Sequence, residues 1–273
     1  MKKVIAYKLA QVDGWDFYTG RTINYRENIG KIVRCPNPNP TLGICSNGVI
    51  HASKNPNDCF IGASIPCSAY KVEGKPVCGD KTKWGFIELK VLEEVINLDQ
   101  LFGWKYNEAI KPINPLRRKV KPTQKDIKLL KVWDSVWDGV WASVRDSVWA
   151  SVGDSVGDSV GNSVWASVGD SVWDSVGDSV RNSVWDSMWD SVRASVRNSV
   201  GDSVRAYIGS LFPNIKSWKY IHHKKGQYPF QSVIDLWERG LTPSFDGKTW
   251  RLHSGRKAEI VFQITEKELK EGK

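Results

Sequence analysis

The dominant pattern in the chain is a run of apolar residues at every fourth position from Val132 to Ile208. Of these 20 positions, 18 hold Val, and the position before each Val is nearly always Ser. The 19 positions that follow them hold 8 Trp, 6 Gly and 5 Arg, and the next position holds Asp, Ala or Asn. We expect the constant Val and Ser to point inward. We expect the variable position to point outward, because replacing a packed Trp with Gly would leave a large cavity.

A period of four restricts the choice of backbone. An α-helix turns by about 100° per residue, so each successive valine would shift by about 40° around it. Gly153, Gly157 and Gly161 also disfavour a helix, and a plain strand alternates with a period of two. We therefore predict a short β-solenoid, in which coils stack and columns of Val fill the axis. The alternative is a long α-helix or a helical bundle.

The predicted fold is mainly β, with small α+β domains on either side of the solenoid. Apolar alternation and turn signals indicate a small α+β domain over residues 1–110. Residues 111–131 read as a basic linker with prolines and a cap, residues 132–208 as the solenoid, and residues 209–273 as a capping domain. Within this last domain we predict a helix over residues 230–239 and strands on both sides of an Asp-Gly turn.

Charge is divided unevenly along the chain. The net charge is +9, yet the repeat array has 11 Asp and 5 Arg with no Glu or Lys between residues 133 and 205. The array is therefore acidic, and the rest of the chain is strongly basic. No apolar stretch is long enough to span a bilayer, and the N-terminus lacks the apolar core of a signal peptide. We expect a cytoplasmic protein with no membrane partner.

The five cysteines all lie in the first 80 residues, where His51 lies among them, and they form no Cys-x-x-Cys pair. An odd count in a cytoplasmic chain favours free thiols over disulfides. We expect no metal site and no cofactor. Near the other end of the chain, Asp246, Arg251 and His253 are interpreted as turn and strand residues and not as a catalytic group.

Two segments resemble parts of uncharacterised phage and bacterial tandem-repeat proteins. The segment Cys45–Ser53 (CSNGVIHAS), with Gly79-Asp80-Lys81 downstream, resembles an N-terminal module with a Cys-x-x-Gly-Leu-His-Ala-Ser core. The segment Pro243–His253 (PSFDGKTWRLH) resembles a recurring C-terminal segment, and the array resembles the solenoids of pentapeptide-repeat proteins. The resemblance implies an association with phages or mobile elements and transfers no activity.

The main functional hypothesis is a non-enzymatic scaffold that binds a protein partner or itself through exposed array residues. These residues are Trp133, Trp137, Trp141, Trp149, Trp165, Trp173, Trp185, Trp189, Arg181, Arg193 and Arg197.

Two alternatives remain open. The N-terminal domain could be ADP-ribosyltransferase-like or handle a nucleotide, which would require a pocket around His51, Tyr18 and Tyr70. The protein could instead bind nucleic acid, because phosphates attract clustered cations. The candidate contacts for nucleic acid are Arg117, Arg118, Lys119, Lys121, Lys224 and Lys225.

Overall fold

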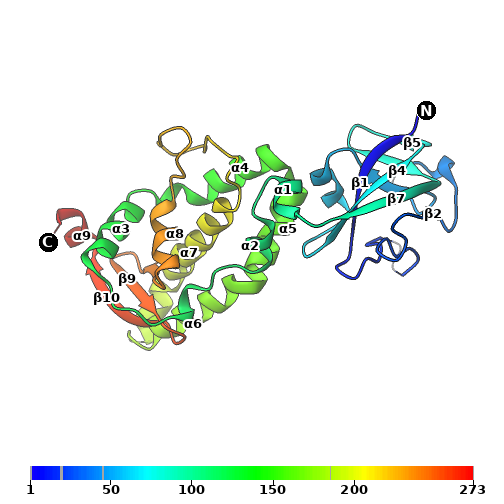
Figure 1. Ribbon diagram of the computed structural model, residues 1–273. Coiled ribbons are helices and arrows are strands. Elements are labelled where there is room, and N and C mark those ends of the chain that lie inside the picture. The colour runs from blue at the N-terminus through cyan, green and yellow to red at the C-terminus, as the bar shows by residue number, and fades with distance from the viewer. Residues whose placement is uncertain (1, 19–20, 45, 185, 273) are drawn as a thin grey trace. The chain divides into compact units, whose positions relative to one another are not determined.

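A computed structural model describes residues 2–18, 21–44, 46–184 and 186–272, except for the side chains at positions 186 and 187. The chain forms two compact units (Figure 1). The N-terminal unit contains the residues up to Asn107 together with Val152–Ser159, and the C-terminal unit contains Glu108–Ser151 and the residues from Val160 onward. None of the helices in the described part of the chain combines the length and the hydrophobicity needed to cross a bilayer.

The N-terminal unit is built on an antiparallel sheet of seven strands in the order β2-β7-β4-β1-β3-β6-β5. Its strands are β1 (Val4–Ala10), β2 (Ile32–Arg34), β3 (Ile50–Ser53), β4 (Ser68–Gly74), β5 (Cys78–Gly79), β6 (Lys83–Phe86) and β7 (Glu88–Val95). The short helices near them are η1 (Pro40–Leu42), η2 (Pro56–Ile61), α1 (Leu98–Phe102) and α2 (Tyr106–Ile110).

The core of this unit lies on one face of the sheet. Ala6 of β1, Val72 of β4 and Phe86 of β6 are fully buried in one hydrophobic cluster. Tyr25 and Tyr70 pack beside them with ring centroids 5.7 Å apart. Alternating strand residues face opposite sides of a sheet, so His51 of β3 lies on the other side from this core, whereas Lys8 of β1 lies on the same side as Ala6.

The C-terminal unit combines helices with an antiparallel sheet of order β10-β9-β8. After η3 (Pro115–Arg117) its elements are α3 (Gln124–Asp134), η4 (Trp137–Gly139), α4 (Val140–Val152), α5 (Asp154–Val164), η5 (Trp165–Gly169), α6 (Asp170–Arg181), α7 (Asp186–Ser210), α8 (Gln231–Glu238), β8 (Thr242–Phe245), β9 (Thr249–Ser254), β10 (Glu259–Thr265) and α9 (Glu266–Glu271). The first part of α5 belongs to the N-terminal unit. The predicted helix near residue 230 and the strands around the Asp-Gly turn are confirmed.

The prediction of a mainly β fold with a repeat solenoid is wrong, because the array folds into helices. The physical reason is that the array is interrupted. Helices α4, α5 and α6 have 13, 11 and 12 residues, so the valine stripe drifts over only about three repeats in each. In α7, which has 25 residues, the stripe drifts further, from the exposed Met188 to the buried Val200. Gly153 separates α4 from α5 with a φ of +87°, a conformation that glycine adopts without strain.

The helical turn η5 corrects the drift between α5 and α6. It is a π-helix, whose wider turn rotates the chain by less per residue than an α-helix does. Four residues of a π-turn complete less than one full turn, so the stripe moves back in the opposite direction. As a result, the valines from Val156 to Val180 are all buried along these three elements.

Several serines of the repeat bond to backbone carbonyls one turn earlier, whereas the buried Ser143 hydroxyl on α4 has no partner. The hydroxyl oxygens of Ser171, Ser183 and Ser203 donate to the carbonyl oxygens of the valines three residues earlier, at 3.1, 2.7 and 2.7 Å. Such bonds let Ser lie in a helix interior, and they also bend the helix. A residue that is a mediocre helix former by propensity is therefore compatible with this packed helical array.

Candidate functional site

A cavity with polar and apolar lining residues lies on the N-terminal unit, beside strands β1, β3 and β6. His51 and Ser53 are two residues apart on β3, so they point to the same side of the sheet. Lys83 of β6 is directly opposite Ser53 in the antiparallel pairing, which places their side chains next to each other. Lys8 comes from β1, and Tyr18 from the loop that follows it.

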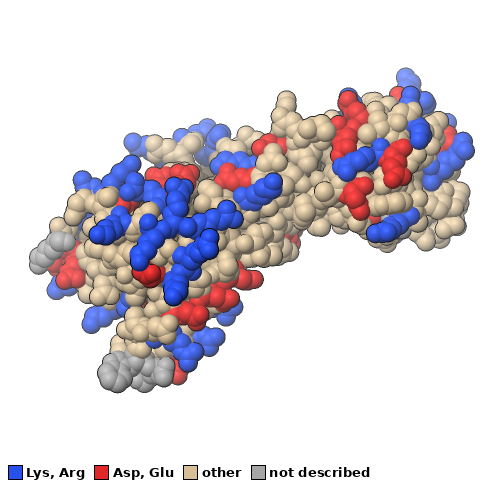
Figure 2. Space-filling view, turned by 60° about the horizontal axis from the view of Figure 1, so that its bottom comes forward, with Lys and Arg blue, Asp and Glu red and all other residues tan. Residues whose placement is uncertain are grey.

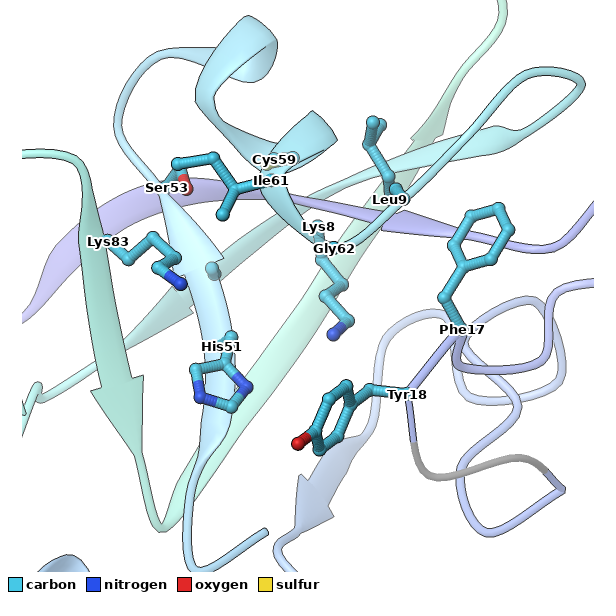
Figure 3. Close-up of a pocket in the computed structure, with 12 residues that line it drawn as sticks. Lys8, Leu9, Phe17, Tyr18, His51, Ser53, Cys59, Ile61, Gly62 and Lys83 are labelled. Atoms are coloured by element: carbon cyan, nitrogen blue, oxygen red, sulfur yellow. The ribbon is translucent and has the colours of Figure 1, made fainter. Parts of the chain in front are cut away.

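The cavity has a volume of about 280 Å³ and is partly apolar (Figure 3). Figure 3 shows the side chains of Lys8 and Lys83 directed toward the side of the cavity where His51 lies. Its lining is Lys8, Leu9, Phe17, Tyr18, His51, Ala52, Ser53, Cys59, Ile61, Gly62, Ala63 and Lys83. Among these described residues there are two ammonium groups and no carboxylate.

Lys8 is held in place by a buried ion pair. Its Nζ lies 2.7 Å from Oδ2 of Asp16, and both side chains are almost entirely buried. The Tyr25 hydroxyl donates to the same oxygen at 2.9 Å, and the backbone N–H of Tyr18 donates to Oδ1 at 2.8 Å. Burial and the Asp16 charge raise the pKa of Tyr25 well above its ordinary value, so that it stays a neutral donor. The Asp16 carboxylate is thus surrounded by donors.

His51 is neutral at neutral pH. Burial lowers its pKa, the charges of Lys8 and Lys83 lower it further, and a bond to the Ile44 carbonyl partly opposes them. The ring Nε2 contacts this carbonyl oxygen, which can only accept, so Nε2 carries the proton and Nδ1 is left as an acceptor. The Tyr18 ring meets the imidazole edge-on, with centroids 6.1 Å apart.

The thiol in the cavity is not an activated nucleophile. Burial raises the pKa of Cys59, so the group is a thiol at neutral pH. Its Sγ donates to the carbonyl of Tyr7 at 3.2 Å. The described cysteines Cys35, Cys59, Cys67 and Cys78 are free, and Cys45 lies outside the described residues. In the described part of the chain, His, Cys, Asp and Glu form no group of three or more that could hold a metal.

The structure places two of the three residues of the predicted pocket in this cavity. His51 and Tyr18 line it, whereas Tyr70 is fully buried in the core against Tyr25. Sequence reasoning missed Lys8 and Lys83, the residues that make the cavity basic. The alternation of His51, Ala52 and Ser53 indicates which side chains of β3 face the cavity. It does not show which other strands pair with β3.

The predicted array residues differ widely in exposure. Trp133 and Trp189 are buried, Trp141 and Trp149 are exposed, and Trp185 lies outside the described residues. The remaining predicted tryptophans, Trp137, Trp165 and Trp173, are half-buried, and Arg181, Arg193 and Arg197 are exposed.

The expectation that the variable position points outward therefore fails for several residues, because Trp, Gly and Arg pack on one another. A Cβ atom on Gly169 would overlap the Trp165 ring, and one on Gly201 would lie 3.6 Å from the same ring. The guanidinium of Arg205 lies 5.9 Å from the Trp165 ring centroid, and that of Arg197 lies 6.0 Å from the Trp173 ring centroid. Large and small residues at equivalent repeat positions thus complement each other within the chain.

The predicted nucleic-acid contacts lie on two different parts of the C-terminal unit. Arg117, Arg118, Lys119 and Lys121 are exposed, and their segment runs beside the β9–β10 turn, where Gly255 N–H donates to the Arg118 carbonyl at 2.9 Å.

Lys224 and Lys225 are exposed in the loop before α8. This loop is bonded to α4 through Lys219 N–H and the Ser147 hydroxyl, which are 3.0 Å apart. Figure 2 shows one face on which Lys and Arg gather over the C-terminal unit beside Asp and Glu. Clustered cations of this kind attract polyanions, and nucleic-acid binding stays a prediction.

Comparison of the chain with protein-family models, curated proteins and solved structures found no match. The resemblance to phage repeat proteins therefore stays a prediction, and the cavity is interpreted from its own chemistry.

Proposed function

We propose that the N-terminal unit binds a small phosphorylated ligand that also carries a flat apolar group, such as a mononucleotide. The observation that carries this proposal is the pair Lys8 and Lys83 in a cavity whose described lining has no carboxylate. Asp16 offsets the charge of Lys8, but Lys83 adds a second ammonium group to a described lining that holds no carboxylate of its own, which favours an anion, and phosphate is a common partner of lysine.

The Asp16 carboxylate next to Lys8 is compatible with the binding of an anion. Its oxygens already accept from Lys8, Tyr25 and the Tyr18 backbone. An ammonium group has three N–H donors, and the ion pair orients that of Lys8. The Asp16 pair therefore fixes the position of a cation that a ligand would meet, and this lowers the entropy lost on binding.

The size and the walls of the cavity narrow the ligand class. A volume of about 280 Å³ lies just below the usual range for small-molecule sites, roughly 300–1,000 Å³, so the ligand must be small. Leu9, Phe17 and Ile61 supply an apolar wall, and Tyr18 supplies an aromatic ring. A nucleoside monophosphate would match this combination, with its base on the apolar side and its phosphate near the lysines.

The same residues favour binding over catalysis. The Cys59 thiol is protonated at neutral pH, and the proton on His51 Nε2 is engaged by a backbone carbonyl. The scaffold function of the array is a separate prediction, independent of this cavity.

Titration calorimetry of the full chain tests the proposal with AMP, adenosine and inorganic phosphate as probes. AMP is expected to bind more tightly than either part alone. Lys83→Ala should weaken AMP binding by about tenfold, the worth of one charge-assisted contact, and raising the salt concentration should weaken it as well.

Lys81→Ala is the matched control, because Lys81 is an exposed neighbour that does not line the cavity. Its affinity for AMP should equal that of the unaltered chain. The proposal fails if the folded protein binds none of the three probes, or if both lysine variants lose affinity equally.

A further inference from the structure

A second concave site lies on the C-terminal unit and has the opposite electrostatic character. It is a groove of about 550 Å³ between η4, the start of α4, the middle of α7 and the end of β8. The residues that line it are Trp137, Asp138, Trp141, Ser195, Asn198, Asp202, Arg205 and Phe245. All but Phe245 belong to the repeat array, so the fold gathers distant repeats at one place.

The aromatic walls are fixed by their neighbours. Trp137 packs edge-on against both Phe245 and Trp250, with each pair of centroids 5.7 Å apart. Phe245 in turn stacks on Trp250 at 4.8 Å. Trp141 is 49% exposed, and the guanidinium of Arg145 lies 4.2 Å from its ring centroid. This ring thus already has a cation over it within the chain.

Carboxylates stand beside these rings. Asp202 is only 9% exposed and accepts from Arg205 at 3.0 Å. Burial raises its pKa to about 6, Arg205 opposes that shift, and the charge of Asp138 adds to it. Above this pH the described lining has two carboxylates against the one guanidinium of Arg205. Arg205 already pairs with Asp202, and Arg145 lies over one wall of the groove, so the feature that favours a cation is the combination of the Asp138 carboxylate with the aromatic faces.

We propose that this groove binds an organic ammonium group, with Trp137 and Trp141 as its walls and Asp138 and Asp202 as its counter-charges. Cations on Trp faces are attracted by the ring quadrupole. An organic cation also fits because its apolar surface can pack on the rings while its charge stays near the acids. A bare metal ion could use only the carboxylates.

The proposal is tested with choline and its uncharged isostere 3,3-dimethylbutan-1-ol, which have the same shape. Ligand-observed NMR titration of the full chain at pH near 7.5 should give an affinity for choline about tenfold above that for the alcohol. Equal affinities would overturn the proposal, because shape alone would then explain binding.

Single substitutions test whether choline binds in this groove. Trp141→Ala and Asp138→Asn should each weaken choline binding by about fivefold or more. Trp149→Ala is the matched control, since Trp149 is exposed on the same helix, is also approached by Arg145 at 5.7 Å, and does not line the groove. Equal losses in Trp141→Ala and Trp149→Ala would overturn the assignment.

A third probe separates the sources of the ammonium group. Nα-acetyl-trimethyllysine methylamide carries the same cation on a protein side chain. Tighter binding of this compound than of choline would indicate a partner protein, and tighter binding of choline would indicate a free small molecule. Loss of both with Trp141→Ala is expected in either case, and retention of both would contradict the proposal.

Discussion

In this chain, the irregular segments and the repeat array bury polar groups in different ways. In the N-terminal unit, an irregular sequence buries a matched pair, Lys8 and Asp16, next to a basic cavity. In the C-terminal unit, the repeats fill the interior with one valine after another, and the groove side of α7 carries the acid Asp202. The comparison shows that irregular segments place buried ion pairs, including Arg251 with Asp246 outside the repeats of the C-terminal unit, while the repeat fills its packed helices with valine.

The largest effect is expected from a charge placed in the valine interior. Val200 on α7 is fully buried, so Val200→Asp should lower the free energy of unfolding by more than about 4 kcal/mol, because an unpaired carboxylate would be desolvated. Urea unfolding measures this. Val132→Asp is the control, since Val132 is 51% exposed, and it should cost less than about 1 kcal/mol. Similar losses in both variants would mean that the valine stripe is not an interior.

The ion pair of the N-terminal unit should show the next largest effect. Asp16→Asn leaves the Lys8 charge buried without its counter-charge, and such losses cost about 3–5 kcal/mol. Glu88→Gln removes the partner of Arg34 in an exposed pair, which should change the free energy of unfolding by less than about 1 kcal/mol. If chemical denaturation finds the two variants equally stable, the buried pair is not a structural anchor.

A smaller effect concerns acidification of the C-terminal unit. Burial lowers the pKa of His253 to about 4; its ring nitrogens contact the Ser244 hydroxyl and the Ala258 carbonyl, both at 2.8 Å. The unfolded chain binds this proton more readily, so His253 should reduce the free energy of unfolding by about 2 kcal/mol between about pH 7 and pH 5. His253→Gln should remove that loss.

Asp202 acts in the opposite direction. Its pKa is raised to about 6 in the folded chain, so protonation favours the folded state as the pH falls from about 6 toward 4. Asp202→Asn should therefore make the unfolding free energy fall more steeply on acidification than in the unaltered chain. Urea titrations at about pH 7, 6, 5 and 4 measure the free energy of unfolding of the unaltered chain, His253→Gln and Asp202→Asn. If its pH dependence is the same in all three, the pKa assignments of His253 and Asp202 are both contradicted.

Local signals predicted the short elements well. The helix near residue 230 and the hairpin at Asp246-Gly247 were predictable because spacing and turn chemistry act over a few residues. The prediction for the array failed because a period of four drifts around an uninterrupted α-helix. The glycine break at Gly153 and the π-turn at Trp165–Gly169 reset the drift, and neither can be recognised from the repeat alone.

The candidate cavity was predictable only in part. His51 and Tyr18 were singled out by their motif and type, but Lys8 and Lys83 became part of the site through the pairing of β1 and β6 with β3. No local pattern assigns a lysine on one strand to a histidine on another, because strand order depends on which hydrophobic faces pack together.

The sequence by itself determined a four-residue repeat with an apolar seam, an acidic array between basic ends, and several local turns and helices. These features depend on side-chain chemistry and on contacts between near neighbours. Only the tertiary structure decided that the seam is helical, that Trp packs over Gly, and that two lysines and two tryptophans line separate sites. Those outcomes depend on packing between distant segments, which the repeat pattern does not encode.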